Sequence, residues 1–211
     1  MDMPTVQTED VHSRAAADAL LSAASDGREA EVAALLKRGV PADVIDGQGN
    51  TPLLLATVRN RVEVARLLIA AGADVNRQNR IHDSAYLLAG ALGHLDILQL
   101  TLAHGAELRS TNRYGGTALI PACERGHVEV VAALLKAGVD PDHVNKLGWT
   151  GLLEAILLSD GGPRHQAIVK QLIEAGANLN LADNDGVTPL QHARQRNQTT
   201  IARMLEVAGA H

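Results

Sequence analysis

A leucine-rich segment that ends in glycine recurs along this 211-residue chain and constrains its fold more than any other feature. The segments follow one another at intervals of 33, 33, 33, 38 and 33 residues. Their terminal glycines are Gly39, Gly72, Gly105, Gly138, Gly176 and Gly209. A unit this short cannot bury an apolar face alone and must stack on its neighbours. The period therefore predicts an all-α solenoid in which each unit contacts only adjacent units, with no separate core.

A second repeated feature marks where the first helix of each unit begins. A hydroxyl residue opens the segments TPLLLA, SAYLLA, TALIPA, TGLLEA and TPLQHA, at Thr51, Ser84, Thr117, Thr150 and Thr188. Such a side chain can accept a hydrogen bond from a free N–H of the first helical turn. Pro52 and Pro189 then fall at the first helical position, where a missing N–H costs nothing. We therefore expect six helix pairs, joined by glycine-containing turns such as residues 46–49 and 183–186.

The 33-residue period and the T-P-L start resemble the ankyrin-repeat family. The resemblance covers residues 14–211 as a single domain of stacked ankyrin repeats, preceded by an N-terminal tail of residues 1–13. The units implied are about 14–44, 45–77, 78–110, 111–143, 144–181 and 182–211. The resemblance implies helix-turn-helix pairs with short β-hairpin-like fingers. It also implies a non-enzymatic protein–protein interaction module with a regulatory, inhibitory or scaffolding role. Certain small bacterial members accompany peroxide defence, so an accessory role in oxidative-stress defence is an alternative.

Composition excludes several other classes of protein. The chain has no Phe, two Tyr and one Trp, too few for aromatic platforms that stack single-stranded nucleic acid. A net charge of −5 provides no general footprint for nucleic acid or anionic membranes. The single cysteine, Cys123, excludes an intrachain disulfide framework. Because no apolar run has the length of a membrane span and the N-terminus lacks signal-peptide features, we expect a soluble cytoplasmic protein. We also expect it to be a monomer. A periplasmic protein whose signal peptide has been removed is the alternative.

The candidate binding residues lie in the fingers and helix ends of units three to five, which the resemblance assigns to a concave partner-binding face. The finger candidates are Arg80, Ile81, Asp83, Arg113, Tyr114, Lys146, Leu147 and Trp149. The helix-end candidates are Leu92, Glu124, Arg125, Leu157 and Leu158. Aromatic residues, arginines and exposed aliphatics are typical of interface hot spots. We expect Tyr114 and Trp149 to share one exposed patch with Arg113, Arg125 and Leu147. The alternative is that both rings pack between fingers and stiffen them.

Two polar residues interrupt a row that is normally apolar on the first helices. The row reads Leu55, Leu88, Pro121, Glu154 and His192. Because a carboxylate on an inner helix surface is costly unless it is paired, the sequence predicts an ion pair between Glu154 and His192. The alternative is a ligand-binding or metal-binding site, or an enzyme, that uses this pair. No nucleophile-elbow, zincin, Walker or dinucleotide-binding motif is present, so we predict no enzyme, no catalytic residue, no cofactor and no metal.

The 38-residue interval contains one insertion, residues 159–163, with the sequence SDGGP. Gly-Gly-Pro cannot continue a helix, so this segment predicts a longer turn between the two helices of unit five. Such a loop serves binding or is merely a tolerated insertion. His94, His127 and His165 occupy matching positions between paired helices. The family resemblance implies that these histidines are structural and link neighbouring turns by hydrogen bonds.

Overall fold

A computed structural model describes the backbone of residues 6–211 and the side chains of residues 14–211. Within residues 6–211 the chain forms helices and no strand. The helix pairs are α1 (Val6–Asp26) with α2 (Glu29–Lys37), α3 (Pro52–Val58) with α4 (Val62–Ala70), α5 (Ala85–Leu92) with α6 (Leu95–Ala103), α7 (Leu119–Glu124) with α8 (Val128–Ala137), α9 (Gly151–Leu157) with α10 (Pro163–Glu174), and α11 (Pro189–Gln195) with α12 (Thr199–Val207). The six predicted helix pairs are confirmed.

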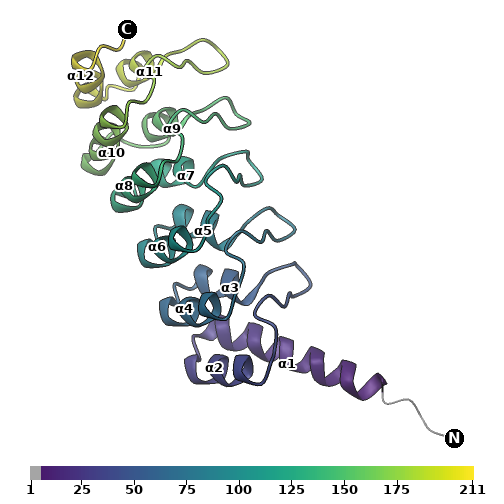
Figure 1. Ribbon diagram of the computed structural model, residues 1–211. Helices are drawn as coiled ribbons and strands as arrows, with labels where there is room; N and C mark the ends of the chain where they lie inside the picture. The colour runs from purple at the N-terminus through teal and green to yellow at the C-terminus, as the bar shows by residue number, and fades with distance from the viewer. Residues whose placement is uncertain (1–5) are drawn as a thin grey trace, which may run out of the picture.

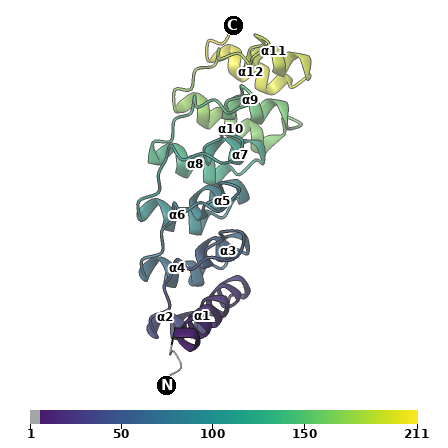
Figure 2. The same cartoon turned by 90° about the vertical axis from the view of Figure 1, so that its right-hand side faces the viewer.

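The pairs stack along one axis, with the first pair, α1 and α2, and the last pair, α11 and α12, at opposite ends of the stack (Figure 1). The first helices of the pairs lie beside the loops, which project to one side, and the second helices lie on the other side (Figures 1 and 2). Across residues 6–211, each helix packs substantially only on helices of its own pair or of an adjacent pair. The solenoid is therefore a one-dimensional stack. No helix in this range is long and apolar enough to cross a membrane.

The core is a thin aliphatic layer because the first helices approach one another closely. A Cβ atom added to Gly90 of α5 would lie 2.9 Å from the Cβ atom of Ala118 and 3.1 Å from its carbonyl oxygen. Tyr86 is fully buried, whereas Trp149 is half-buried and Tyr114 is exposed. Close-packed interiors resist even small added volumes. The spacing between helices thus accounts for the scarcity of aromatic residues.

The predicted hydroxyl caps are present at four of the five helix starts. The side-chain oxygens of Thr51, Ser84, Thr150 and Thr188 each accept a hydrogen bond from the backbone N–H three residues later. Thr117 is the exception, since its hydroxyl is buried without a hydrogen-bond partner. Pro121 has no N–H to donate to the Thr117 carbonyl, and Ile120 N–H bonds that carbonyl instead, at 3.3 Å. The proline therefore removes the cap that the repeat pattern predicts.

Each finger is one turn built around its first residue, rather than a pair of strands. The five first residues are Asp46, Asn79, Asn112, Asn145 and Asp183. In every case the side-chain oxygen accepts hydrogen bonds from the backbone N–H groups two and four residues later. Adjacent fingers also bond to each other, as where Lys146 N–H donates to the Tyr114 carbonyl at 3.0 Å. The fingers are therefore fixed individually and relative to their neighbours.

The N-terminal boundary differs from the prediction. Helix α1 begins at Val6, so residues 6–13 are helical and continue the first helix of the stack. No proline or glycine separates them from the rest of α1, so nothing in the chain stops the helix at residue 14. The repeat pattern misses this extension because it marks only repeated positions. The remainder of the expected tail, residues 1–5, lies outside the described residues.

The insertion in unit five forms the predicted turn between two helices. Pro163 opens α10 at its first turn, and residues 158–162 connect it to α9. Gln198 of unit six donates hydrogen bonds to the carbonyls of Ile156, at 2.9 Å, and Ser159, at 3.1 Å. The loop is therefore held by the next unit along the stack.

The histidines between paired helices behave differently from one another. His165 Nε2 donates to the Glu124 carbonyl at 2.8 Å, which links unit five to unit four as the family resemblance implies. His127 Nε2 is buried without a partner. The Ala91 carbonyl, which matches that of Glu124 one repeat earlier, accepts instead from Arg125 Nη1 at 2.7 Å. Arg125 thus links unit four to unit three at the Ala91 carbonyl, which His127 also faces.

Thr150, whose hydroxyl caps its helix, and Thr117, whose hydroxyl has no partner, provide a matched test of the caps. We expect Thr150→Val to lower the free energy of unfolding by about 1 kcal/mol, because the substitution removes a hydroxyl cap at constant size. We expect Thr117→Val to leave the stability unchanged or to raise it, because it removes only an unpaired buried hydroxyl. Chemical denaturation of both variants measures the difference. Equal losses would contradict the assignment of Thr117 as uncapped.

Candidate functional site

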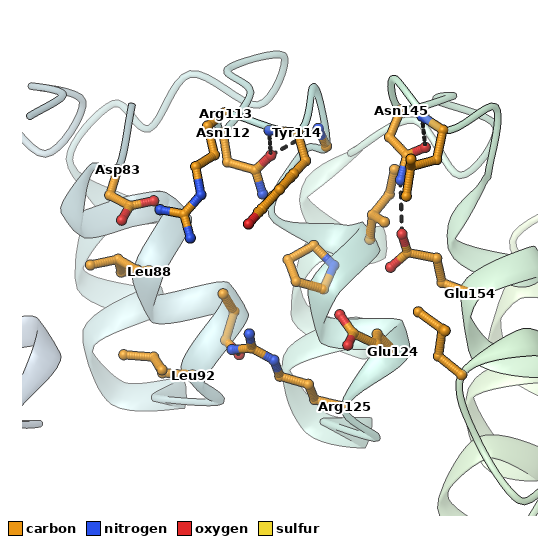
Figure 3. A pocket seen from close by; sticks show the side chains of 16 residues that line it. Asp83, Leu88, Leu92, Asn112, Arg113, Tyr114, Glu124, Arg125, Asn145 and Glu154 are labelled. Carbon is orange, nitrogen blue, oxygen red and sulfur yellow. Dashed lines mark hydrogen bonds between the residues drawn. The ribbon is translucent and has the colours of Figure 1, made fainter. Parts of the chain in front are cut away.

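A pocket of about 460 Å³ lies between the fingers and the first helices of units three to five (Figure 3). It is lined from helices α5, α7 and α9 and from the fingers that precede them. Eight residues proposed from the sequence lie on its wall: Asp83, Leu92, Arg113, Tyr114, Glu124, Arg125, Leu147 and Leu158. The structure therefore brings most of the candidate binding residues into one concave surface.

Five sequence candidates lie outside the pocket lining. Arg80, Ile81 and Lys146 are exposed on the fingers, whereas Leu157 and Trp149 are half-buried. Of the expected patch, Tyr114, Arg113, Arg125 and Leu147 share the pocket wall, but Trp149 does not. Sequence reasoning did not place Asn112, Asn145 and Glu154 in the site. Their signal in the sequence is positional: the two asparagines are the first residues of their fingers.

The two pocket arginines lie toward α5, and each interacts with another group of the protein. The Arg113 guanidinium lies over the Tyr114 ring, 4.8 Å from its centroid, and points toward Asp83 (Figure 3). Burial raises the pKa of the Asp83 carboxyl, while Arg113 acts in the opposite direction. Arg125 reaches from α7 to donate to the Ala91 carbonyl at 2.7 Å. The positive charge in the pocket is therefore already engaged by the protein.

The Glu154 carboxylate is the most deeply buried charge in the pocket, at 6% exposure. Asn145 Nδ2 donates to its Oε1 atom at 2.8 Å. The Asn145 Oδ1 atom in turn accepts from the N–H groups of Leu147, at 2.9 Å, and Trp149, at 3.1 Å. Burial, reinforced by the nearby Glu124 carboxylate, raises the pKa of Glu154 to about 7, against the opposing effects of Asn145 and Arg125. Near neutral pH this group is therefore poised between its two charge states.

The predicted ion pair between Glu154 and His192 is wrong. His192 Nε2 lies 2.7 Å from the Oδ2 atom of Asp183, and Glu154 is bonded by Asn145. In both units the helix residue contacts the first residue of its own finger, nine positions earlier in the chain. The finger folds over its own helix, so each polar residue of the row finds its partner within the unit. An acid/base dyad between Glu154 and His192 has no hydrogen bond or ion pair to support it among the side chains of residues 14–211.

Cys123 is fully buried in the core. Burial raises the pKa of the Cys123 thiol far above its usual range, which keeps it a neutral core residue. No group of three His, Cys, Asp or Glu residues that could hold a metal ion occurs in the described part of the chain.

Comparison with known proteins identifies the family. The sequence model of ankyrin repeats, in three copies, matches residues 6–79, 85–181 and 137–210. The chain belongs to the ankyrin-repeat family. It is 40% identical over 195 residues to the ankyrin repeat protein YahD of Escherichia coli strain K12, an alignment that covers 92% of this chain and 96% of that protein.

Solved structures of ankyrin repeat proteins have the same fold. An ankyrin repeat domain from Acinetobacter baumannii AYE superposes with a TM-score of 0.89 and 55% identity, covering 91% of this chain and 98% of that one. The ankyrin repeat domain of Bcl-3, a member of the IkappaB protein family, superposes with a TM-score of 0.82 and 29% identity, covering 92% and 86% of the two chains. Ankyrin repeats are generally non-enzymatic modules of protein–protein interaction.

The raised pKa of Glu154 makes stability depend on pH in a defined direction. The pKa of a glutamate is about 4.3 when it is unperturbed, so the folded protein binds this proton more tightly than the unfolded chain does. The stabilisation of the folded state by protonated Glu154 is fully present below the unperturbed pKa of about 4.3. It is lost as the pH rises through the folded-state pKa of about 7. Glu154→Gln keeps an oxygen for Asn145 but does not titrate. We expect its stability relative to the wild type to increase between pH 5 and pH 8, by about 1 kcal/mol or more.

Urea denaturation of both proteins at several pH values measures this difference. Glu174→Gln, on the exposed face of α10, is the matched control and should give a difference that changes little over the same range. If the free energy of unfolding of Glu154→Gln differed from that of the wild type by the same amount at every pH, the assignment of Glu154 as the titrating group would be contradicted.

Proposed function

We propose that this ankyrin protein binds a partner protein through the pocket face, defined as the fingers and first-helix residues that line the pocket of units three to five. The observation that carries the proposal is the exposure of large apolar side chains around this hollow. Tyr114 is 56% exposed, Leu147 is 54% exposed and Leu158 is 48% exposed. Apolar residues that are clustered and rimmed by polar groups mark interaction sites. Tyrosine and arginine at the centre of such a surface are typical hot-spot residues.

The rigidity of the fingers supports the same function. The side chain of Asn112 holds its finger through two backbone N–H groups, and Asn145 does the same in the next finger. Lys146 joins the two fingers through its N–H to the Tyr114 carbonyl, at 3.0 Å, and through its Nζ to the Arg113 carbonyl, at 2.9 Å. A surface that is already ordered loses little conformational entropy when it binds.

On this proposal the protein works without catalysis, as a monomer in the cytoplasm, and regulates, inhibits or scaffolds its partner by covering part of the partner's surface. The sequence candidates outside the pocket lining form the flanks of the interface: Arg80, Ile81, Lys146, Leu157 and Trp149. Flanking charges contribute more to the association rate than to affinity. The central contacts are assigned to Tyr114, Leu147 and Leu158.

Affinity capture from a native lysate, followed by mass spectrometry, tests the proposal. We expect Tyr114→Ala to recover at least about tenfold less of the partner than the wild type does, since truncation of a central aromatic costs about 2 kcal/mol or more of binding free energy. Arg66→Ala, on the exposed face of α4, is the control and should recover the partner normally. Thermal melting of both variants checks that they remain folded. Equal recovery by Tyr114→Ala and the wild type would contradict the assignment of the pocket face.

A further inference from the structure

We propose that the pocket receives a basic side chain, lysine or arginine, from the partner protein, and that Glu154 and Glu124 hold its charged end. This inference rests on the proposed function, because it specifies the chemistry of the partner at the same face. The supporting observations are the distribution of charge in the pocket, the incomplete hydrogen bonding of Glu154, and the apolar wall beside it.

The pocket carries more negative than positive charge, and the two kinds are separated. Its lining has three carboxylates, on Asp83, Glu124 and Glu154, and two guanidinium groups, on Arg113 and Arg125. Both guanidinium groups lie toward α5, whereas Glu124 stands on α7 and Glu154 on α9 (Figure 3). The side of the pocket between α7 and α9 is therefore locally acidic. A cation fits there better than an anion does, because the arginines already interact with protein groups.

Glu154 has fewer protein partners than an ionised carboxylate can accept. One hydrogen bond, from Asn145 to Oε1, is present, and no ion pair to Glu154 occurs among the side chains of residues 14–211. The second carboxylate oxygen points toward the pocket interior (Figure 3). An ionised carboxylate can accept about four hydrogen bonds, and a buried charge without a partner is costly. An ammonium or guanidinium group would supply both the missing donors and the opposite charge.

Rotation of the Asn145 amide group cannot supply the hydrogen bonds that Glu154 lacks. Its Oδ1 atom is held by the backbone N–H groups of Leu147 and Trp149, which fixes its amide nitrogen on Glu154. The same row position in unit six shows the alternative arrangement, in which the carboxylate of Asp183 pairs with His192 at 2.7 Å. In unit six the carboxylate therefore has a partner within the unit. In unit five no cationic side chain pairs with Glu154.

The walls of the pocket suit the aliphatic stem of a long basic side chain. Pro121, which is buried, and Leu147, which is half-exposed, line the pocket beside the two glutamates. The ring of Tyr114 lines the part of the pocket nearer α5, beneath the Arg113 guanidinium (Figure 3). Lysine and arginine bury their stems against such surfaces while the charged end reaches a polar group. The groups that face Glu154 are Glu124, Arg125, Asn145 and the buried Cys123 thiol. A bound cation favours the ionised form of Glu154, so binding should strengthen as the pH rises through 7.

Selection from a random peptide library on the full chain at pH 8 tests this inference without a known partner. We expect the selected peptides to share a lysine or arginine. Replacement of that arginine by citrulline, or of that lysine by norleucine, removes the charge at nearly constant size and should weaken binding at least tenfold. Fluorescence anisotropy of labelled peptides measures the affinities. On Glu154→Gln the basic peptide should lose a similar factor, while the neutral peptide should bind much as it does to the wild type. Glu174→Gln, on α10, is the matched control and should change neither affinity.

The outcomes separate the two proposals. Peptides that require Tyr114 but bind equally well with citrulline or norleucine would overturn the inference and leave the proposed function standing. Peptides that are indifferent to both Tyr114→Ala and Glu154→Gln bind elsewhere and would overturn both. A library that yields no binder with a basic residue would also overturn the inference. An affinity that does not change between pH 6 and pH 8 on the wild type would contradict the role of Glu154.

Discussion

The close approach of consecutive first helices is the constraint on which the rest of this structure depends. A Cβ atom on Gly151 would lie 3.0 Å from the Cys123 sulfur, and one on Gly90 would lie 2.9 Å from the Ala118 Cβ atom. At this spacing the core admits alanine, valine, leucine and isoleucine, with Tyr86 as the aromatic exception. Because each unit contacts only its neighbours, the same spacing sets the distance between successive fingers. Residues one repeat apart therefore lie in rows across a single face.

The proposed function rests on small departures from the repeat within this regular face. In units five and six a polar residue on the helix contacts the first residue of its own finger. In unit six the pair is a carboxylate and a histidine, and the two groups bond to each other. In unit five the pair is an amide and a carboxylate, so the ionised form of Glu154 has no opposite charge paired with it, in a pocket that exposed Tyr114 and Leu147 also line. The regular scaffold thus presents one irregular, acidic and partly apolar hollow.

Much of the fold could be predicted because a strict period fixes the register. The spacing of glycines and hydroxyl residues gave the six helix pairs, four of the five caps and the position of the insertion. The period could not reveal features that do not repeat. It gave no indication that α1 continues back to Val6, or that the missing N–H of Pro121 would leave Thr117 without a cap.

The pocket was only partly predictable for a related reason. The register identified which residues share a face, and eight of the proposed residues do line the pocket. It did not reveal the direction in which each side chain leans. Glu154 and His192 occupy adjacent positions of one row, yet each turns toward its own finger. Trp149 has a finger position like that of its neighbours, yet it is half-buried and lies outside the pocket lining.

A crystal structure of the full chain with its captured partner would test the central claim most directly. The account predicts that the partner covers the pocket face and contacts Tyr114, and that a nitrogen of a lysine or arginine side chain lies within about 2.7–3.2 Å of the Glu154 carboxylate. A partner bound to the second helices, with the pocket between α5, α7 and α9 left open to solvent, would contradict it.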